Sequence, residues 1–200
     1  IPHSMGISMA STSQAGKTGL SPTVTLKDVT GAVLSTGDYA DATITASISN
    51  DTEKIFIVSG GSAIAEEGIA TFSNLVIGGL VGTDYVLTFS VDYLDEQDNP
   101  QTLTTNSAEF GIIPGDATKL GLDLSSQTVA SRIGLQPINV SVQDVYGNVR
   151  ATLGESNITL NEVIGEATLV GNKNPVASFT TKTFADLVLN GKVGSYDLVF

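Results

Sequence analysis

The stretch ATFSNLVIGGLVGTDYVLTF, residues 70–89, recurs in altered form as KTFADLVLNGKVGSYDLVF, residues 182–200. The two copies share a Phe, a Leu, a Gly and a Tyr in the same order: Phe72, Leu75, Gly82 and Tyr85 correspond to Phe184, Leu187, Gly194 and Tyr196. The spacing is constant except for a gap of one residue before the Tyr. A repeated segment of this length predicts that the chain contains two copies of one structural unit.

The duplication extends towards the N-terminus of each copy. MGISMASTSQAGKTGLSP (Met5–Pro22) aligns with LGLDLSSQTVASRIGLQP (Leu120–Pro137), and VTLKDVTGAV (Val24–Val33) aligns with VSVQDVYGNV (Val140–Val149). A repeat of roughly 112–116 residues has the size of a whole domain rather than of a solenoid unit. We therefore expect two tandem domains, residues 1–113 and 114–200, joined by a short segment at Pro114 and Gly115.

Apolar residues recur at every second position within each half. The rows are Val24 and Leu26; Ala42, Ile44, Ala46 and Ile48; Tyr85, Leu87, Phe89, Val91 and Tyr93; Leu120, Leu122 and Leu124; Ile138, Val140 and Val142; and Tyr196, Leu198 and Phe200. Side chains alternate across a pleated strand, so each row predicts the buried face of a half-exposed strand. Gly, Asn, Asp and Pro separate these segments, and no amphipathic helix stands out. The pattern predicts an all-β chain of antiparallel sandwiches.

The combination resembles tandem bacterial immunoglobulin-like repeats of the filamin-like and invasin-like kind. The likeness is carried by Asp-x-x-Gly in VTLKDVTGAV and VSVQDVYGNV, by the later Phe-x-x-Leu, and by Gly followed by Tyr-x-Leu. It covers nearly the whole chain. It implies two tandem immunoglobulin-like antiparallel β-sandwiches in an extracellular, cell-surface protein. The modules of this family space, stiffen or self-associate, and the resemblance carries over no catalytic residue.

The duplicated phrase predicts a strand, a turn across the end of the sandwich, and a Tyr that starts the next strand. We expect Gly82 and Gly194 to adopt backbone angles that a β-carbon resists. We expect the hydroxyls of Tyr85 and Tyr196 to bond back to nearby backbone, as in the tyrosine corner of immunoglobulin-like sandwiches. In the first half a last strand, residues 102–113, follows the phrase.

The second half stops at Phe200, before any such strand. We therefore expect the second domain to lack its last strand. Either the fragment was cut there, or a neighbouring chain completes the sheet by strand addition. The expected partners are thus adjacent domains of the same polypeptide and further copies.

The composition argues against several classes of function. The net charge is −12, and residues 1–113 hold 13 acidic and 3 basic side chains. Such a surface repels nucleic-acid phosphate and anionic lipid, so neither is an expected partner. No segment approaches the roughly 18 unbroken apolar residues of a membrane helix, so no membrane insertion is expected. There is no Cys, and the single His is His3 at the extreme start of the chain. We expect no enzyme activity and no catalytic residues.

The best chemical candidate is the segment DYLDEQDNP, which holds Asp92, Asp95, Glu96, Asp98 and Asn99. Ca²⁺ takes about six to eight oxygen ligands, and a loop dense in carboxylates can supply several. The alternative is a solvated hairpin tip whose charges prevent pairing with other chains. Ca²⁺ is the one cofactor that the sequence suggests.

Three sequons could accept an N-glycan if the host modifies extracellular proteins: Asn50, Asn139 and Asn157. Tyr39 and Tyr146 lie in expected loops, where an aromatic ring could serve as a platform for a sugar.

The function expected from the sequence is that of a non-enzymatic repeat segment in a large cell-surface or filament-forming protein, such as an adhesin stalk, a surface layer or an appendage. It would act as a stiff spacer and assembly module. The alternatives are a calcium-dependent adhesion or ligand-binding module and an accessory module of a secreted hydrolase.

Overall fold

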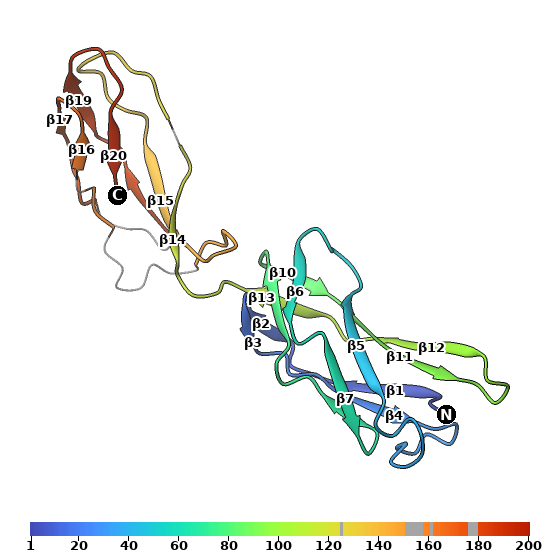
Figure 1. The fold of residues 1–200 in the computed structure, drawn as a ribbon. Coiled ribbons are helices and arrows are strands. Elements are labelled where there is room, and N and C mark those ends of the chain that lie inside the picture. The colour runs from blue at the N-terminus through green and yellow to red at the C-terminus, as the bar shows by residue number, and fades with distance from the viewer. Residues whose placement is uncertain (125, 151–157, 161, 176–179) are drawn as a thin grey trace. The chain divides into compact units, whose positions relative to one another are not determined.

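The computed structural model describes every residue except 125, 151–157, 161 and 176–179. The chain divides into two compact units, Ile1–Gly115 and Asp116–Phe200 (Figure 1). The division falls next to the expected joint at Pro114. Every regular element in the described residues is a β-strand, which confirms the prediction of an all-β chain.

The first unit contains the strands β1 to β13. They are β1 (Ser4–Ser8), β2 (Thr12–Gln14), β3 (Lys17–Thr18), β4 (Thr23–Lys27), β5 (Thr43–Ile48), β6 (Ile55–Ser59), β7 (Ser62–Glu66), β8 (Ile69–Thr71), β9 (Val76–Gly79), β10 (Gly82–Tyr85), β11 (Leu87–Leu94), β12 (Pro100–Asn106) and β13 (Phe110–Ile113). The largest sheet has the strand order β1-β4-β8-β7-β5-β11-β12. Two smaller sheets have the orders β10-β13-β2 and β3-β9-β6. All pairs are antiparallel except β13 with β2.

The core of the first unit is formed by the predicted inner rows. Val24 and Leu26 of β4 are fully buried, as are Leu87 and Phe89 of β11. The ring of Phe89 meets that of Phe72 edge to face, with the centroids 5.1 Å apart. Each such buried side chain stabilises the fold by about 1.5–3 kcal/mol. The alternation read from the sequence is therefore correct for these strands.

The second unit contains the strands β14 to β20. They are β14 (Lys119–Leu122), β15 (Ile138–Gln143), β16 (Glu162–Ile164), β17 (Ala167–Val170), β18 (Thr181–Phe184), β19 (Val188–Gly191) and β20 (Asp197–Val199). They form one sheet of order β14-β15-β18 and the pairs β16-β20 and β17-β19. Its core consists of Ile138, Val140, Val142, Ile158, Leu160, Leu169, Phe184 and Leu187.

Several strand pairs of the first unit recur in the second in matching register, apart from a bulge in β6 between Ile57 and Ser59. β1 pairs β4 as β14 pairs β15, and β6 pairs β9 as β17 pairs β19. Val24 lies opposite Ala70 between β4 and β8, and Val140 lies opposite Lys182 between β15 and β18. The repeated sequence segments thus form equivalent pairs of hydrogen-bonded strands in the two units.

The turn after β4 is also repeated after β15. The Oδ1 atom of Asp28 accepts hydrogen bonds from the amides two and four residues later, at 2.8 and 3.0 Å. Asp144 does the same, at 2.9 Å in both cases. Gly31 and Gly147 close these turns with φ of 83° and 90°, a region in which Gly avoids the clash of a β-carbon. Asp-x-x-Gly is therefore a turn motif in both units.

Part of the predicted core of the second unit is wrong. Leu120 and Leu122 were expected on an inner row, yet they are 41% and 48% exposed, and Leu124 is half-buried. Leu198 and Phe200, by contrast, are half-buried and pack against the core, as their row predicted. The alternation is present, but a buried row also needs a layer that covers it. Within the described part of the second unit, no strand takes the place that β12 and β13 have in the first.

Candidate functional site

The turn inside the duplicated phrase is anchored by its Tyr in both units. The Oη atom of Tyr85 donates a hydrogen bond to the carbonyl oxygen of Leu80 at 3.1 Å. The Oη atom of Tyr196 donates to the carbonyl oxygen of Lys192 at 2.8 Å. Each hydroxyl thus reaches back across the turn to upstream backbone, which confirms the predicted contact.

The glycines of this turn have a different purpose from the predicted one. Neither Gly82 nor Gly194 has a positive φ, so the expectation of special backbone angles is wrong. A β-carbon on Gly82 would lie 2.5 Å from Oη and 2.9 Å from Cζ of Tyr85. In the second unit a β-carbon on Gly191 would lie 2.8 Å from Oη of Tyr196. Gly82 thus leaves room for the Tyr ring in the first unit. In the second unit Gly191 of β19 does so, since a β-carbon on Gly194 would lie 3.8 Å from Oη of Tyr196, an ordinary contact.

The acidic hairpin tip between β11 and β12 is organised by one carboxylate. Oδ1 of Asp95 accepts hydrogen bonds at 2.9 Å from the backbone amides of Gln97 and Asn99, and Oδ2 accepts from Nε2 of Gln101 at 3.2 Å. These donors, first the amide of Asn99, lower the pKa of Asp95 below its usual value. Asp95 therefore acts as the local acceptor that shapes the turn.

The five candidate calcium ligands are not gathered around one point. Oδ1 of Asp92 accepts from Oγ1 of Thr102 at 2.6 Å, while Glu96 and Asp98 are exposed on the tip. Nδ2 of Asn99 donates to the Asp95 carboxylate. Among the described residues no group of three or more His, Cys, Asp or Glu side chains is placed to hold a metal ion. Calcium binding at this tip stays a prediction.

The sequons lie in different surroundings. Nδ2 of Asn50 donates to the carbonyl oxygen of Asp84 at 2.8 Å, and Oδ1 accepts from the amide of Val86 at 2.9 Å. Nδ2 of Asn139 donates to the carboxylate of Asp123. Both amide groups thus take part in internal contacts. Asn157 lies outside the described residues.

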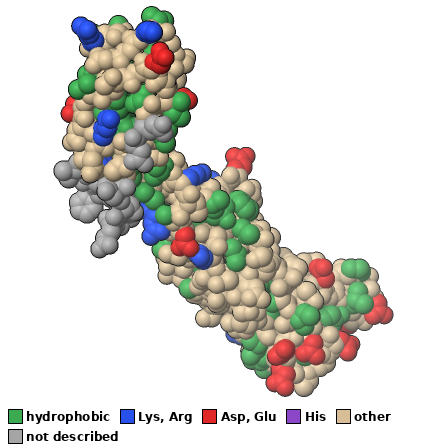
Figure 2. Space-filling view, turned by 60° about the vertical axis from the view of Figure 1, so that its left-hand side comes forward, with side chains coloured by type: hydrophobic (Ala, Val, Ile, Leu, Met, Phe, Trp, Pro, Cys, Tyr) green, Lys and Arg blue, Asp and Glu red, His purple; other side chains and the backbone are tan. Residues whose placement is uncertain are grey.

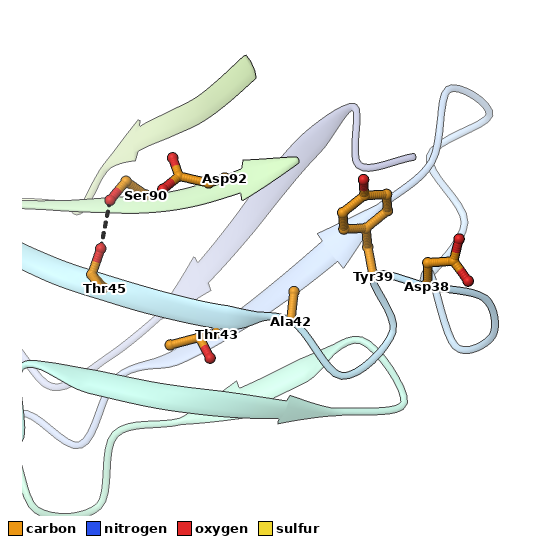
Figure 3. Close-up of a pocket in the computed structure, with 7 residues that line it drawn as sticks. All are labelled: Asp38, Tyr39, Ala42, Thr43, Thr45, Ser90 and Asp92. Carbon is orange, nitrogen blue, oxygen red and sulfur yellow. Dashed lines mark hydrogen bonds between the residues drawn. The ribbon is translucent and has the colours of Figure 1, made fainter. Parts of the chain in front are cut away.

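An open groove lies beside the acidic hairpin, between β5 and β11 (Figure 3). Its lining consists of Asp38, Tyr39, Ala42, Thr43, Thr45, Ser90 and Asp92. Thr45 and Ser90 point toward one another, and their hydroxyl oxygens are 2.7 Å apart. The sequence reasoning did not find these hydroxyls, although they occupy the polar positions between the apolar residues of both strands.

Tyr39 fastens the loop before β5 to the hairpin. Its Oη accepts a hydrogen bond from the amide of Leu94 at 2.7 Å. Its ring meets that of Tyr93 edge to face, with centroids 6.2 Å apart. Of the two aromatic residues expected in loops, Tyr39 therefore holds the groove wall in place.

Acidic side chains are spread over one end of the first unit (Figure 2). The first unit holds most of the chain's excess negative charge. A groove edged by Asp38 and Asp92 suits a neutral or cationic group better than an anion.

The second unit contains a buried lysine that the sequence comparison did not single out. Lys182 is 4% exposed and stands where the first unit has Ala70. Its Nζ donates a hydrogen bond to Oδ1 of Asn174 at 2.5 Å. Burial of an ammonium group is costly unless it is paired, so this contact compensates part of the loss of hydration.

Within the described residues there is no helix that could span a membrane. No protein-family model, no curated protein and no solved structure matches this chain.

Proposed function

We propose that this chain is a non-enzymatic structural segment of a large extracellular protein, of the kind that forms an adhesin stalk, a surface layer or an appendage. In this proposal the two units are immunoglobulin-like sandwiches. They act as a spacer that resists extension and as a module for assembly.

The observation that carries the proposal is that both units have the same anchored turn. Tyr85 and Tyr196 each bond back to an upstream backbone carbonyl at the equivalent position, that of Leu80 and that of Lys192. The repeated ladders β1–β4 and β14–β15 add to this likeness. A repeated scaffold fits a spacer, because each unit adds length and resists extension in the same way.

Pulling on single molecules of the chain by its ends tests the proposal. We expect two separate unfolding events, with length gains of at most about 390 Å for Ile1–Gly115 and about 290 Å for the second unit, at about 3.4 Å per residue and less the extent of each folded unit. Tyr85→Phe should lower the force of the longer event, and Tyr196→Phe that of the shorter one.

Tyr93→Phe serves as the matched control, because the hydroxyl of Tyr93 makes none of the described hydrogen bonds. A chain that extends without resolved force peaks would refute the mechanical role.

A further inference from the structure

Lys182 of β18 is a primary amine enclosed by the second unit. It is 4% exposed, and among the described residues it is the one buried basic side chain. It lies opposite Val140 of β15 and two positions before Phe184, and both of these side chains are fully buried on the inner face of the sheet. The stem of the lysine therefore lies in the apolar interior, where its neighbours restrict the position of Nζ.

The Nζ atom of Lys182 is placed against a side-chain amide. It lies 2.5 Å from Oδ1 of Asn174. The C=O bond is about 1.23 Å long, so Cγ of Asn174 is at most about 3.7 Å from Nζ. Reacting atoms in near-attack geometry are about 3–3.5 Å apart, and well-oriented pairs reach effective molarities of about 10⁵–10⁸ M. The amine is thus held near reacting distance of an electrophilic carbon.

The segment that presents Asn174 is fixed by hydrogen bonds. The amide of Leu160 donates to the carbonyl oxygen of Lys173 at 3.1 Å. The amide of Asn174 donates to Oδ1 of Asn172 at 2.9 Å, and the amide of Asn172 donates to Oδ1 of Asp186 at 3.4 Å. The Asn174 amide group therefore stays close to Nζ. Asn174 itself is exposed, so a small product released there reaches solvent.

The residue after Asn174 removes a competing reaction. The side-chain amide of an Asn is commonly attacked by the backbone N–H of the next residue, which forms a cyclic succinimide. Pro175 follows Asn174 and has no N–H. Cγ of Asn174 is therefore left to a nucleophile from another part of the chain.

We infer that Lys182 and Asn174 form an intramolecular isopeptide bond. Nζ bonds to Cγ of Asn174, and the Cγ–Nδ2 bond breaks with its electron pair on Nδ2. The two protons that the ammonium form of Nζ gives up convert the leaving NH₂ group to ammonium, so no other reactant is consumed. The product is a secondary amide that ties β18 to the segment after β17. The reaction also removes a positive charge from the interior, which favours the product.

The equivalent position of the first unit lacks the amine. Ala70 of β8 lies opposite Val24 of β4, as Lys182 lies opposite Val140. We therefore expect one such bond in the chain. The inference goes beyond the spacer role, because the condensation depends only on this pair of side chains.

Mass spectrometry of the intact 200-residue chain tests the inference. We expect a mass below that of the sequence by one ammonia. A tryptic digest should contain a branched peptide that joins Asn174 to Lys182, since trypsin does not cleave after an acylated lysine.

Three variants make the result specific. Asn174→Ala changes an exposed residue and leaves the core intact, and it should have the full mass of its sequence. Lys182→Met keeps an unbranched apolar stem in the core and should also have its full mass. Lys173→Met removes an exposed lysine next to Asn174 and should still lose one ammonia.

Two outcomes would overturn the inference. One is the full sequence mass in the folded parent chain after days at neutral pH. The other is a loss of ammonia that persists in Lys182→Met or Asn174→Ala, since a succinimide at Asn190, which Gly191 follows, changes the mass by the same amount. Neither outcome changes the two unfolding events expected of a spacer, so that role is tested separately.

Discussion

At the scale of single residues, the hydroxyl of Tyr85 is a defined contribution to the stability of the first unit. Replacement by Phe removes the hydrogen bond to Leu80 and leaves the ring in place. We expect Tyr85→Phe to lower the free energy of unfolding by about 1 kcal/mol. Tyr196→Phe should lower the free energy of unfolding by less, because Tyr196 is half-buried and water can replace the lost hydrogen bond more easily. Urea denaturation of both variants measures the difference, and equal stability of Tyr85→Phe and the parent chain would contradict it.

Gly82 provides a second prediction at this scale. In Gly82→Ala the new β-carbon would meet a Tyr85 ring that is held in the core, so we expect a loss of about 1–3 kcal/mol from overpacking. Gly6→Ala is the matched control, because its β-carbon would lie 3.5 Å from the nearest Lys27 atoms. Thermal unfolding compares them. Equal melting temperatures of Gly82→Ala and Gly6→Ala would show that the close approach of Gly82 to the Tyr85 ring does not affect stability.

These residues show what the sequence could predict. The bond of Tyr85 was predicted from the resemblance of this phrase to a tyrosine corner, in which the hydroxyl bonds back to nearby backbone. The role of Gly82 was not predictable. A sequence does not distinguish a glycine that is required for its backbone angle from one that leaves space for a nearby ring, here the ring of Tyr85 three residues later. Lys182 was missed because lysine is rarely buried, although its spacing of two from Phe184 places it on the inward face.

At the scale of elements, the β11–β12 hairpin depends on an ionised Asp95. The pKa of this carboxyl is lowered in the folded chain, chiefly by the amide of Asn99, from a usual value of 3.8. A lowered carboxyl pKa adds stability above 3.8, and this stability is lost as the pH falls through the folded pKa. We expect Asp95→Asn to reduce the fall in melting temperature between neutral and strongly acidic pH.

Asp98→Asn is the control for this measurement, because the Asp98 carboxylate makes none of the described hydrogen bonds and lies on the same tip. If the two variants lose stability in acid to the same extent as the parent chain, the Asp95 contacts do not shape the hairpin.

Strands were easier to predict than the surroundings of their side chains. The apolar row from Tyr85 to Val91 was correctly predicted to be buried. A strand in the middle of a sheet has one face covered by the core, as the alternation of its side chains implies. Leu120 and Leu122 alternate equally well and are exposed, because cover depends on what lies across from a strand. Likewise, a count of acids in DYLDEQDNP cannot reveal that Asp95 already accepts bonds from its own turn.

At the scale of the whole molecule, the two units should unfold separately, because each has its own core. Phe72→Ala and Phe184→Ala each delete a buried ring, at 2% and 0% exposure, and should each cost about 3–5 kcal/mol. Calorimetry should show two transitions. Phe72→Ala should displace the transition of the first unit, and Phe184→Ala should displace or abolish that of the second. One transition that responds to both variants would mean a shared core.

The parallel pairing of β13 with β2 has a consequence for synthesis on the ribosome. Ser13 emerges early, but its partner Ile112 emerges only when nearly all of the first unit has been made. Contacts between residues so distant along the chain form slowly, since a large loop must close first. While translation continues, the apolar face that β13 later seals stays open to solvent and to other nascent chains. At the usual rate of elongation the hundred or so residues between the two strands take roughly 5–20 s to be added, and during this time we expect the open face to be a site of aggregation with other chains.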